Sequence, residues 1–201
     1  MAPRVEACHK EGVTMRLVLL AFIPAIALGY LIGGRLRYLA EVRFRHSWAA
    51  LAGIALQFLP VGGTLGYVAL MASFALLLFV AIANLRLPGF PLVMAGLCLN
   101  FLVIGVNQGM PVTREAIVAS GQTQTLESLA RERGTKHHLA TDEDRLLFLG
   151  DVIGIPPPVR QAVSVGDIVA YGGAMWLVVA GMRRPRDGTA PEPSTAAEVP
   201  G

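Results

Sequence analysis

Long apolar runs with few charges dominate the pattern of hydrophobic and polar positions along the chain. Five segments qualify, at residues 17–34, 47–63, 65–85, 90–106 and 165–182. A bilayer core about 30 Å thick needs roughly 17–25 helical residues to cross it. Backbone groups in hydrocarbon must also pair within the segment, which favours helices. The pattern therefore predicts an all-α membrane protein, a bundle of about five transmembrane helices with a partly ordered extracytoplasmic loop, 107–164, before the last helix.

The overall composition supports a membrane protein over a soluble one. Hydrophobic residues make up 54% of the chain, charged residues only 15%, and the mean hydropathy is +0.56. A soluble domain carries about 25% charged residues. The formal net charge of +3 comes from arginines beside apolar runs rather than from a basic patch, so no nucleic-acid partner is expected.

The arginines predict an orientation. With five crossings and the N-terminus outside, one side of the membrane receives eight of them: Arg35, Arg37, Arg43, Arg45, Arg86, Arg183, Arg184 and Arg186. The short turn at 62–66 on the other side has no positive charge. Because cytoplasmic segments carry an excess of arginine and lysine, we expect a multi-pass protein of the bacterial cytoplasmic membrane with its C-terminus in the cytoplasm.

The first apolar segment has a second interpretation, a cleaved signal peptide. Lys10 and Arg16 resemble a basic n-region, residues 17–23 an apolar h-region, and 25–27 (Ala-Ile-Ala) a cleavage site. Its removal would leave four spans and would force all eight arginines outside, against the usual bias. An uncleaved helix is the better hypothesis.

Polar segments are expected at both ends of the chain. Residues 1–14 form a polar N-terminal extension, and Met15 is a candidate native start. Residues 15–183 form the transmembrane domain. Residues 184–201 are rich in Pro and small residues, which predicts a disordered cytoplasmic tail.

Few polar side chains lie at membrane depth, and none near a midplane is ionisable. Gln57, Asn100 and Asn107 are candidate ligand-binding residues, lining a path in a small transporter. For Asn100, a hydrogen bond between helices is the favoured interpretation over a ligand contact. Gly29 and Gly33 form a GxxxG spacing that favours close helix packing. The lack of buried ionisable groups argues against an ion-coupled pathway.

The outer loop contains features of local structure. Thr125 is expected to cap a helix at 126–133, and Ser164 to cap the last apolar helix, with Asp167 in its first turn. Residues 146–149 and 152–155 are apolar and are expected to dock on the bundle or lie at the interface. Residues 156–158 (Pro-Pro-Pro) predict an extended connection.

The loop also carries the main candidate chemistry, namely His137, His138, Asp142, Asp144 and Asp151. Histidine and carboxylate ligands can bind zinc or manganese, but this spacing matches no established metal motif, and a solvated run of charges explains it. We predict no metal and no cofactor. The same five residues are the catalytic candidates for an enzyme, although no nucleophile with an adjacent base accompanies them.

Four motifs, in order between the apolar segments, resemble a bacterial family of unknown function made of small five-span membrane proteins. They are Asn107-Gln108-Gly109-Met110-Pro111-Val112, Lys136-His137-His138, Leu149-Gly150-Asp151-Val152-Ile153 and Ser164-Val165-Gly166-Asp167-Ile168. The resemblance extends over residues 15–182. It implies the architecture and a bacterial inner membrane, and it implies no activity.

The leading functional hypothesis is a membrane-embedded binding or scaffold component that presents the outer loop to a lipid, a small ligand or a partner. The alternatives are a membrane enzyme with a His/Asp site in the loop, and a small transporter. The expected partners are the lipid bilayer and a membrane-protein partner or a second copy of the chain.

Overall fold

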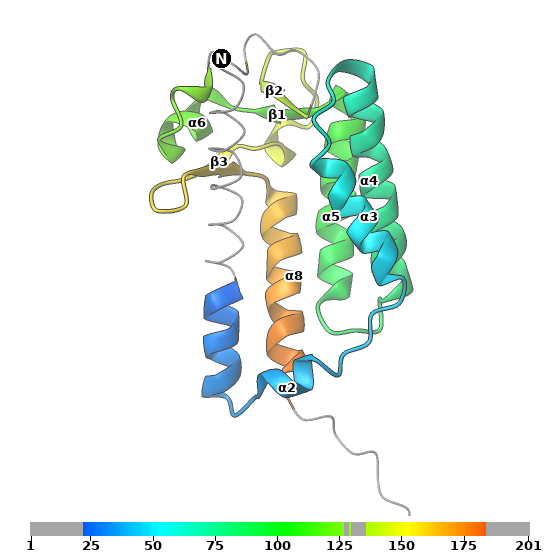
Figure 1. The fold of residues 1–201 in the computed structure, drawn as a ribbon. Helices are drawn as coiled ribbons and strands as arrows, with labels where there is room; N and C mark the ends of the chain where they lie inside the picture. Colours follow the sequence, from blue (N-terminus) through cyan, green and yellow to red (C-terminus); the bar gives the residue numbers. More distant parts are fainter. Residues whose placement is uncertain (1–21, 127–128, 130–135, 184–201) are drawn as a thin grey trace, which may run out of the picture.

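The computed structural model describes residues 22–126, 129 and 136–183 and is mostly helical (Figure 1). Its longer helices are Phe22–Leu31, α3 (Ser47–Gln57), α4 (Gly63–Ala83), α5 (Phe90–Asn107) and α8 (Val165–Gly181), and the short α2 (Leu36–Leu39) lies across their lower end. The expected extension 1–14, the candidate start at Met15 and the expected tail 184–201 lie outside the described residues.

Two helices, α4 and α5, are long and apolar enough by length and composition to cross a membrane. Three other apolar helices are shorter: Phe22–Leu31, α3 and α8. α5 and α8 begin where the apolar segments 90–106 and 165–182 begin. The segment 17–34 is helical over Phe22–Leu31, and its first residues lie outside the described part of the chain.

α3 is shorter than the apolar segment 47–63 predicts. It ends at Gln57 after 11 residues, about 16 Å of helix. Pro60 cannot donate a helical hydrogen bond, and Gly63 adopts a positive φ of 59°. The chain from 58 to 62 is therefore not helical.

The described residues of 107–164, hereafter the cap, contain strands that an all-α prediction missed. The elements are β1 (Met110–Val112), α6 (Arg114–Ser120), β2 (His137–Leu139), the 3-10 helix η1 (Leu147–Leu149), β3 (Ile153–Ile155) and β4 (Gln161–Val163). β1 and β2 pair in parallel with Met110 opposite His137, and β3 and β4 pair antiparallel with Ile153 opposite Val163. Three-residue strands are too short to produce a readable hydropathy period, so the sequence pattern did not reveal them.

The cap differs from the sequence prediction at its run of prolines. The prolines at 156–158 lie in the turn that joins β3 to β4, and not in an extended connection. Most of the helix expected at 126–133 lies outside the described residues.

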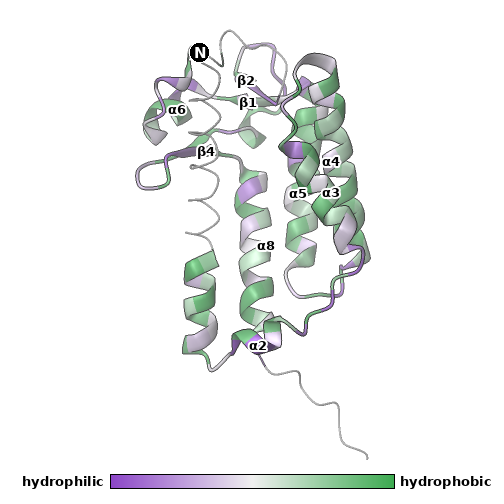
Figure 2. Ribbon diagram, in the orientation of Figure 1, coloured by the Kyte–Doolittle hydropathy of each residue, from purple (hydrophilic) through white to green (hydrophobic). Residues whose placement is uncertain are grey.

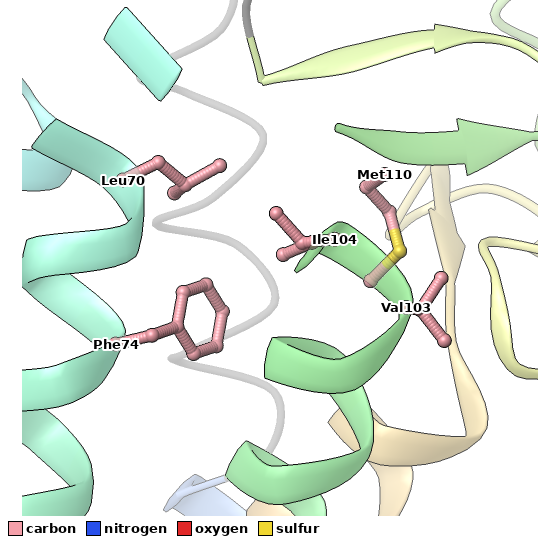
Figure 3. Close-up of a cluster of buried hydrophobic side chains, with 5 residues drawn as sticks. All are labelled: Leu70, Phe74, Val103, Ile104 and Met110. Atoms are coloured by element: carbon pink, nitrogen blue, oxygen red, sulfur yellow. The ribbon is translucent and has the colours of Figure 1, made fainter. Parts of the chain in front are cut away.

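The cap packs directly on the helices. Leu70 and Phe74 of α4, Val103 and Ile104 of α5 and Met110 of β1 form a buried cluster (Figure 3). Leu146 and Leu149 pack against this cluster, which confirms that the apolar run at 146–149 docks on the bundle. Full burial of a side chain of this size contributes about 1.5–3 kcal/mol.

Glycines allow α5 and α8 to approach closely along their length. A Cβ atom added to Gly173 of α8 would lie 2.5 Å from the carbonyl oxygen of Gly89 and 2.7 Å from the amide nitrogen of Val93. At the other end of the same seam, a Cβ atom on Gly96 would meet the backbone of Gly166 and Ala170, and one on Gly166 would meet the Asn100 side chain and the carbonyl oxygen of Gly96. Of the predicted GxxxG pair, Gly29 contacts Met182, whereas Gly33 forms a turn with φ +84°.

Candidate functional site

The N-terminus of α8 is the point where the cap joins the helices. Ser164 accepts a hydrogen bond from the Asp167 amide through Oγ (2.9 Å), and Asp167 Oδ2 accepts one from the Ser164 amide (3.1 Å). The two bonds form a capping box, which confirms the predicted cap. The carboxylate also lies at the positive end of the helix dipole.

Asn100 of α5 extends this arrangement to a second helix. Its Nδ2 donates to Asp167 Oδ1 (2.7 Å), and its Oδ1 accepts from the Ser164 hydroxyl (2.9 Å). The space for the amide exists because residue 166 is glycine, whose missing side chain would meet Asn100. Asn100 and Ser164 are buried, so α5 and α8 share a satisfied polar network in the interior.

Asp151 lies beside this network with incomplete partners. Its backbone belongs to the cap, since it bridges Val112 of β1. Its side chain is only 7% exposed. Within the part of the chain that the structure describes, Oδ1 has no hydrogen-bond partner, and Oδ2 lies 3.6 Å from His137 Nε2.

The pKa of the Asp151 carboxyl is raised well above its ordinary value of 3.8, first by burial and then by the negative charge of Asp167. Burial disfavours the charged form of an acid. The junction therefore favours the protonated form of this carboxyl over the charged form.

The second His–Asp pair closes a turn within the cap. His138 Nε2 and Asp144 Oδ1 are 2.8 Å apart, and Asp144 Oδ2 accepts from the Thr141 amide (2.7 Å) and hydroxyl (3.2 Å). Burial opposes ionisation of Asp144, but the hydrogen bonds from Thr141 and His138 outweigh it and lower the carboxyl pKa below 3.8. The lowered pKa favours the charged form of Asp144, which holds the turn through its hydrogen bonds to Thr141 and His138.

The remaining candidates bind separate partners. Asn107 Oδ1 accepts from the Arg145 amide (2.8 Å) while Nδ2 donates to the Arg145 carbonyl (2.8 Å). Gln57 Nε2 donates to Ser73 Oγ (2.9 Å), and Lys136 donates to the carbonyl of Gln57. The structure thus brings Asn100 to the junction and places Asn107 and Gln57 in two other contacts.

The five His/Asp candidates form two pairs, His137 with Asp151 and His138 with Asp144, while Asp142 is exposed. Across residues 22–126, 129 and 136–183, no group of three or more His, Cys, Asp or Glu residues is arranged to hold a metal. The junction network itself was not predicted as a site. Its sequence signal, Ser164 three residues before Asp167, indicated a helix cap and not the connection to Asn100.

Comparison with known protein families identifies a relationship for most of the chain. Residues 41–179 match the profile of a family of unknown function (DUF5317), a stretch that includes most of the helices and the whole cap. No curated protein and no solved structure matches the chain. The chain belongs to the DUF5317 family.

Proposed function

We propose that this member of the DUF5317 family is a multi-pass integral membrane protein that acts as a binding or scaffold component. Its helices anchor it in the bilayer, and its cap presents a fixed surface on the extracytoplasmic side to a lipid, a small ligand or a partner. In this proposal the protein resides in the bacterial cytoplasmic membrane, with the N-terminus outside and the C-terminus in the cytoplasm.

The observation that carries the membrane proposal is the exposure of large apolar side chains on the helices. Leu31, Trp48 and Leu51 are 83%, 66% and 69% exposed. Only 33% of the apolar window of α4 and 28% of that of α5 is buried, and the helices are apolar along most of their length (Figure 2). Soluble monomers rarely expose contiguous apolar patches of this kind, whereas lipid covers them.

The distribution of charge supports the proposed orientation. The described residues of 33–46, 84–89 and 182–183 meet at one end of the bundle and contain six arginines and one glutamate. In the proposal, α3 is one of five passes. Because α3 alone is shorter than a bilayer core of about 30 Å, residues 58–62 complete this pass where protein or water, and not lipid, surrounds their backbone.

The fixed cap supports a binding or scaffold role. The capping box at Ser164, the bonds between Asn107 and Arg145, and the buried Met110 hold it to the helices at three points. Phe148 of η1 and Val118 of α6 are 66% and 54% exposed on it. Apolar side chains on a preorganised surface bind at a low entropic cost.

The orientation is tested with two exposed arginines, one at each end. In a background with Cys8 and Cys98 replaced by serine, Arg114→Cys in α6 should react with a membrane-impermeant maleimide in intact cells, and Arg86→Cys should react only after permeabilisation. Ser120 lies in the same helix as Arg114 but is buried, so a cysteine there would not be accessible to the reagent. If only Arg86→Cys reacted in intact cells, the orientation would be the reverse of the proposed one.

The binding role is tested by photocrosslinking in intact membranes. A photoreactive amino acid in place of Phe148 should give a reproducible crosslinked product, and the same group in place of Glu115, an exposed charged residue of α6, should give much less. Equal products from both positions, or none from either, would contradict a binding surface at η1.

The enzyme and transporter alternatives stay predictions. An enzyme would have to work with one of the two separate His–Asp pairs, because the structure does not bring the five candidates together. A transporter would have to bring Gln57, Asn100 and Asn107 to one path, and in the structure each has its own partner.

A further inference from the structure

The arginine-rich end of the bundle contains a cleft of about 280 Å³, between α2 and its following loop, the turn from α4 to α5, and the end of α8. This volume is near the lower limit of small-molecule sites, about 300 Å³. Its wall includes apolar side chains, Val42, Leu87 and Leu177, and three charged residues, Glu41, Arg43 and Arg183.

The loop that forms one side of the cleft is fixed at both of its ends. The Arg35 amide donates to the carbonyl of Met182 (2.7 Å). Ten residues later, the Arg45 amide donates to Asn84 Oδ1 (2.8 Å), and Asn84 Nδ2 donates back to the Arg45 carbonyl (3.0 Å). Asn84 is 3% exposed, so this bracket is sheltered from competing water.

The intervening residues also pack. The rings of Phe44 and Phe90 lie 6.0 Å apart between centroids, which holds the loop against the start of α5. A Cβ atom on Gly181 would lie 2.7 Å from Leu39 Cδ1 and 3.2 Å from Val42 Cγ2, so α8 and the loop are in close contact. The cleft is thus built between fixed elements and does not depend on a free loop.

The charges at the cleft favour an anion. Arg43 and Arg183 are exposed, and among the described residues no ion pair neutralises either of them or Glu41. Arginine presents a planar fork of donors that matches phosphate oxygens. The apolar wall beside the arginines suits the start of an acyl chain.

We propose that this cleft binds the headgroup of an anionic phospholipid, with Arg43 and Arg183 on the phosphate and the apolar wall against the upper acyl chain. The assignment rests on the proposed membrane orientation, which places the cleft at the cytoplasmic surface, where anionic lipids and basic pockets meet.

The test uses the full chain in detergent and follows thermal unfolding with added short-chain lipid. Dihexanoyl phosphatidylglycerol should raise the unfolding temperature more than dihexanoyl phosphatidylcholine. Arg43→Gln and Arg183→Gln should each weaken the apparent phosphatidylglycerol affinity about five-fold. The control Arg114→Gln/Arg160→Gln, which removes two exposed cap arginines, should retain the preference. Arg43→Lys should give an affinity between those of the wild type and Arg43→Gln, because lysine keeps the charge but not the planar fork. Glu41→Gln should strengthen the affinity.

Three results would overturn the assignment. Equal shifts with the two lipids would indicate an apolar groove without headgroup selection. An equal shift with inorganic phosphate alone would indicate a site for a free anion. Loss of the preference in the cap control would indicate general surface charge. A protein that alkaline carbonate extracts from membranes contradicts the proposed function itself, whereas a membrane-retained protein without lipid preference contradicts only this site.

Discussion

At each end of the bundle, an asparagine at the end of a helix holds a loop through backbone hydrogen bonds. The two contacts differ mainly in their surroundings. At the end of α4, Asn84 bonds the amide and carbonyl of Arg45 and also the carbonyl of Val80, four residues earlier in its helix. At the end of α5, Asn107 bonds Arg145 and the Val103 carbonyl in the same pattern. An asparagine at the end of a helix can thus fix the backbone of a distant segment through hydrogen bonds to its amide and carbonyl groups.

The difference between the ends lies in what each loop encloses. At the cap end, Asp151 is buried and Met110 packs into a core shared with the helices. At the arginine end, the loop leaves a cleft bordered by Arg43 and Arg183. The same anchoring contact therefore lies beside a buried carboxylate and a packed core at one end, and beside an open cleft at the other.

The largest effect is expected at the packed interface between α5 and α8, which connects the two ends of the bundle. Gly173→Ala would place a methyl group against the backbone of Gly89 and Val93, which should destabilise the fold by about 3 kcal/mol. Gly172→Ala is the matched control, because a Cβ atom there has nothing within 4 Å and should be neutral or stabilising. Thermal unfolding in detergent measures both. Equal effects of the two substitutions would show that this interface is not tightly packed.

A smaller effect is expected at the cap junction. Asn100→Ala would remove the hydrogen bonds to Asp167 and Ser164 in a buried site, at a cost of about 2–3 kcal/mol. Hydrogen exchange should localise the loss to the start of α8 and to the cap. If the amides of α2 open equally, the two ends are more strongly coupled than the contacts indicate.

The Asn84–Arg45 and Asn107–Arg145 hydrogen-bonded contacts should contribute different free energies of unfolding, because the two asparagines differ in burial. Asn84→Ala should destabilise the protein by about 2 kcal/mol, and Asn107→Ala by about 1 kcal/mol or less, because water can replace the lost bonds more easily at the half-buried site. Unfolding of the two single variants and the double variant measures this. A larger loss for Asn107→Ala would contradict the ranking by burial.

A further effect is a dependence of cap stability on pH. The folded-state pKa of Asp151 is raised, so its contribution is fully present below the unfolded value of about 3.8 and is lost as pH rises through the folded pKa. Asp151→Asn should remove this slope and make the cap more stable at neutral pH. Hydrogen exchange of β1 amides between pH 4 and pH 8 measures it.

Asp144 provides the opposite control, because its pKa is lowered. Its contribution is present above about 3.8 and is lost as pH falls through the folded pKa. Asp144→Asn should therefore destabilise the cap at neutral pH. A stabilising Asp144→Asn, or a destabilising Asp151→Asn, would reverse the roles assigned to the two carboxyls.

The sequence by itself determined what depends on nearby residues. The starts of α5 and α8 follow from apolar runs bounded by Gly89 and by Ser164, since hydropathy and capping act within a few residues. Docking of Leu146 and Leu149 also followed, because a run of apolar side chains is costly to leave in water, whereas Phe148 in the same run is exposed.

Only the tertiary structure decided what depends on residues far apart in the chain. The strand pairs join Met110 to His137 and Ile153 to Val163, and their three residues each are stable only because the rest of the cap aligns them. Burial of Asp151, the bracket formed by Asn84 and the cleft beside Arg43 likewise arise from contacts between separate elements. Local patterns do not encode such contacts, because their energy is realised only when the packed helices and loops exclude water together.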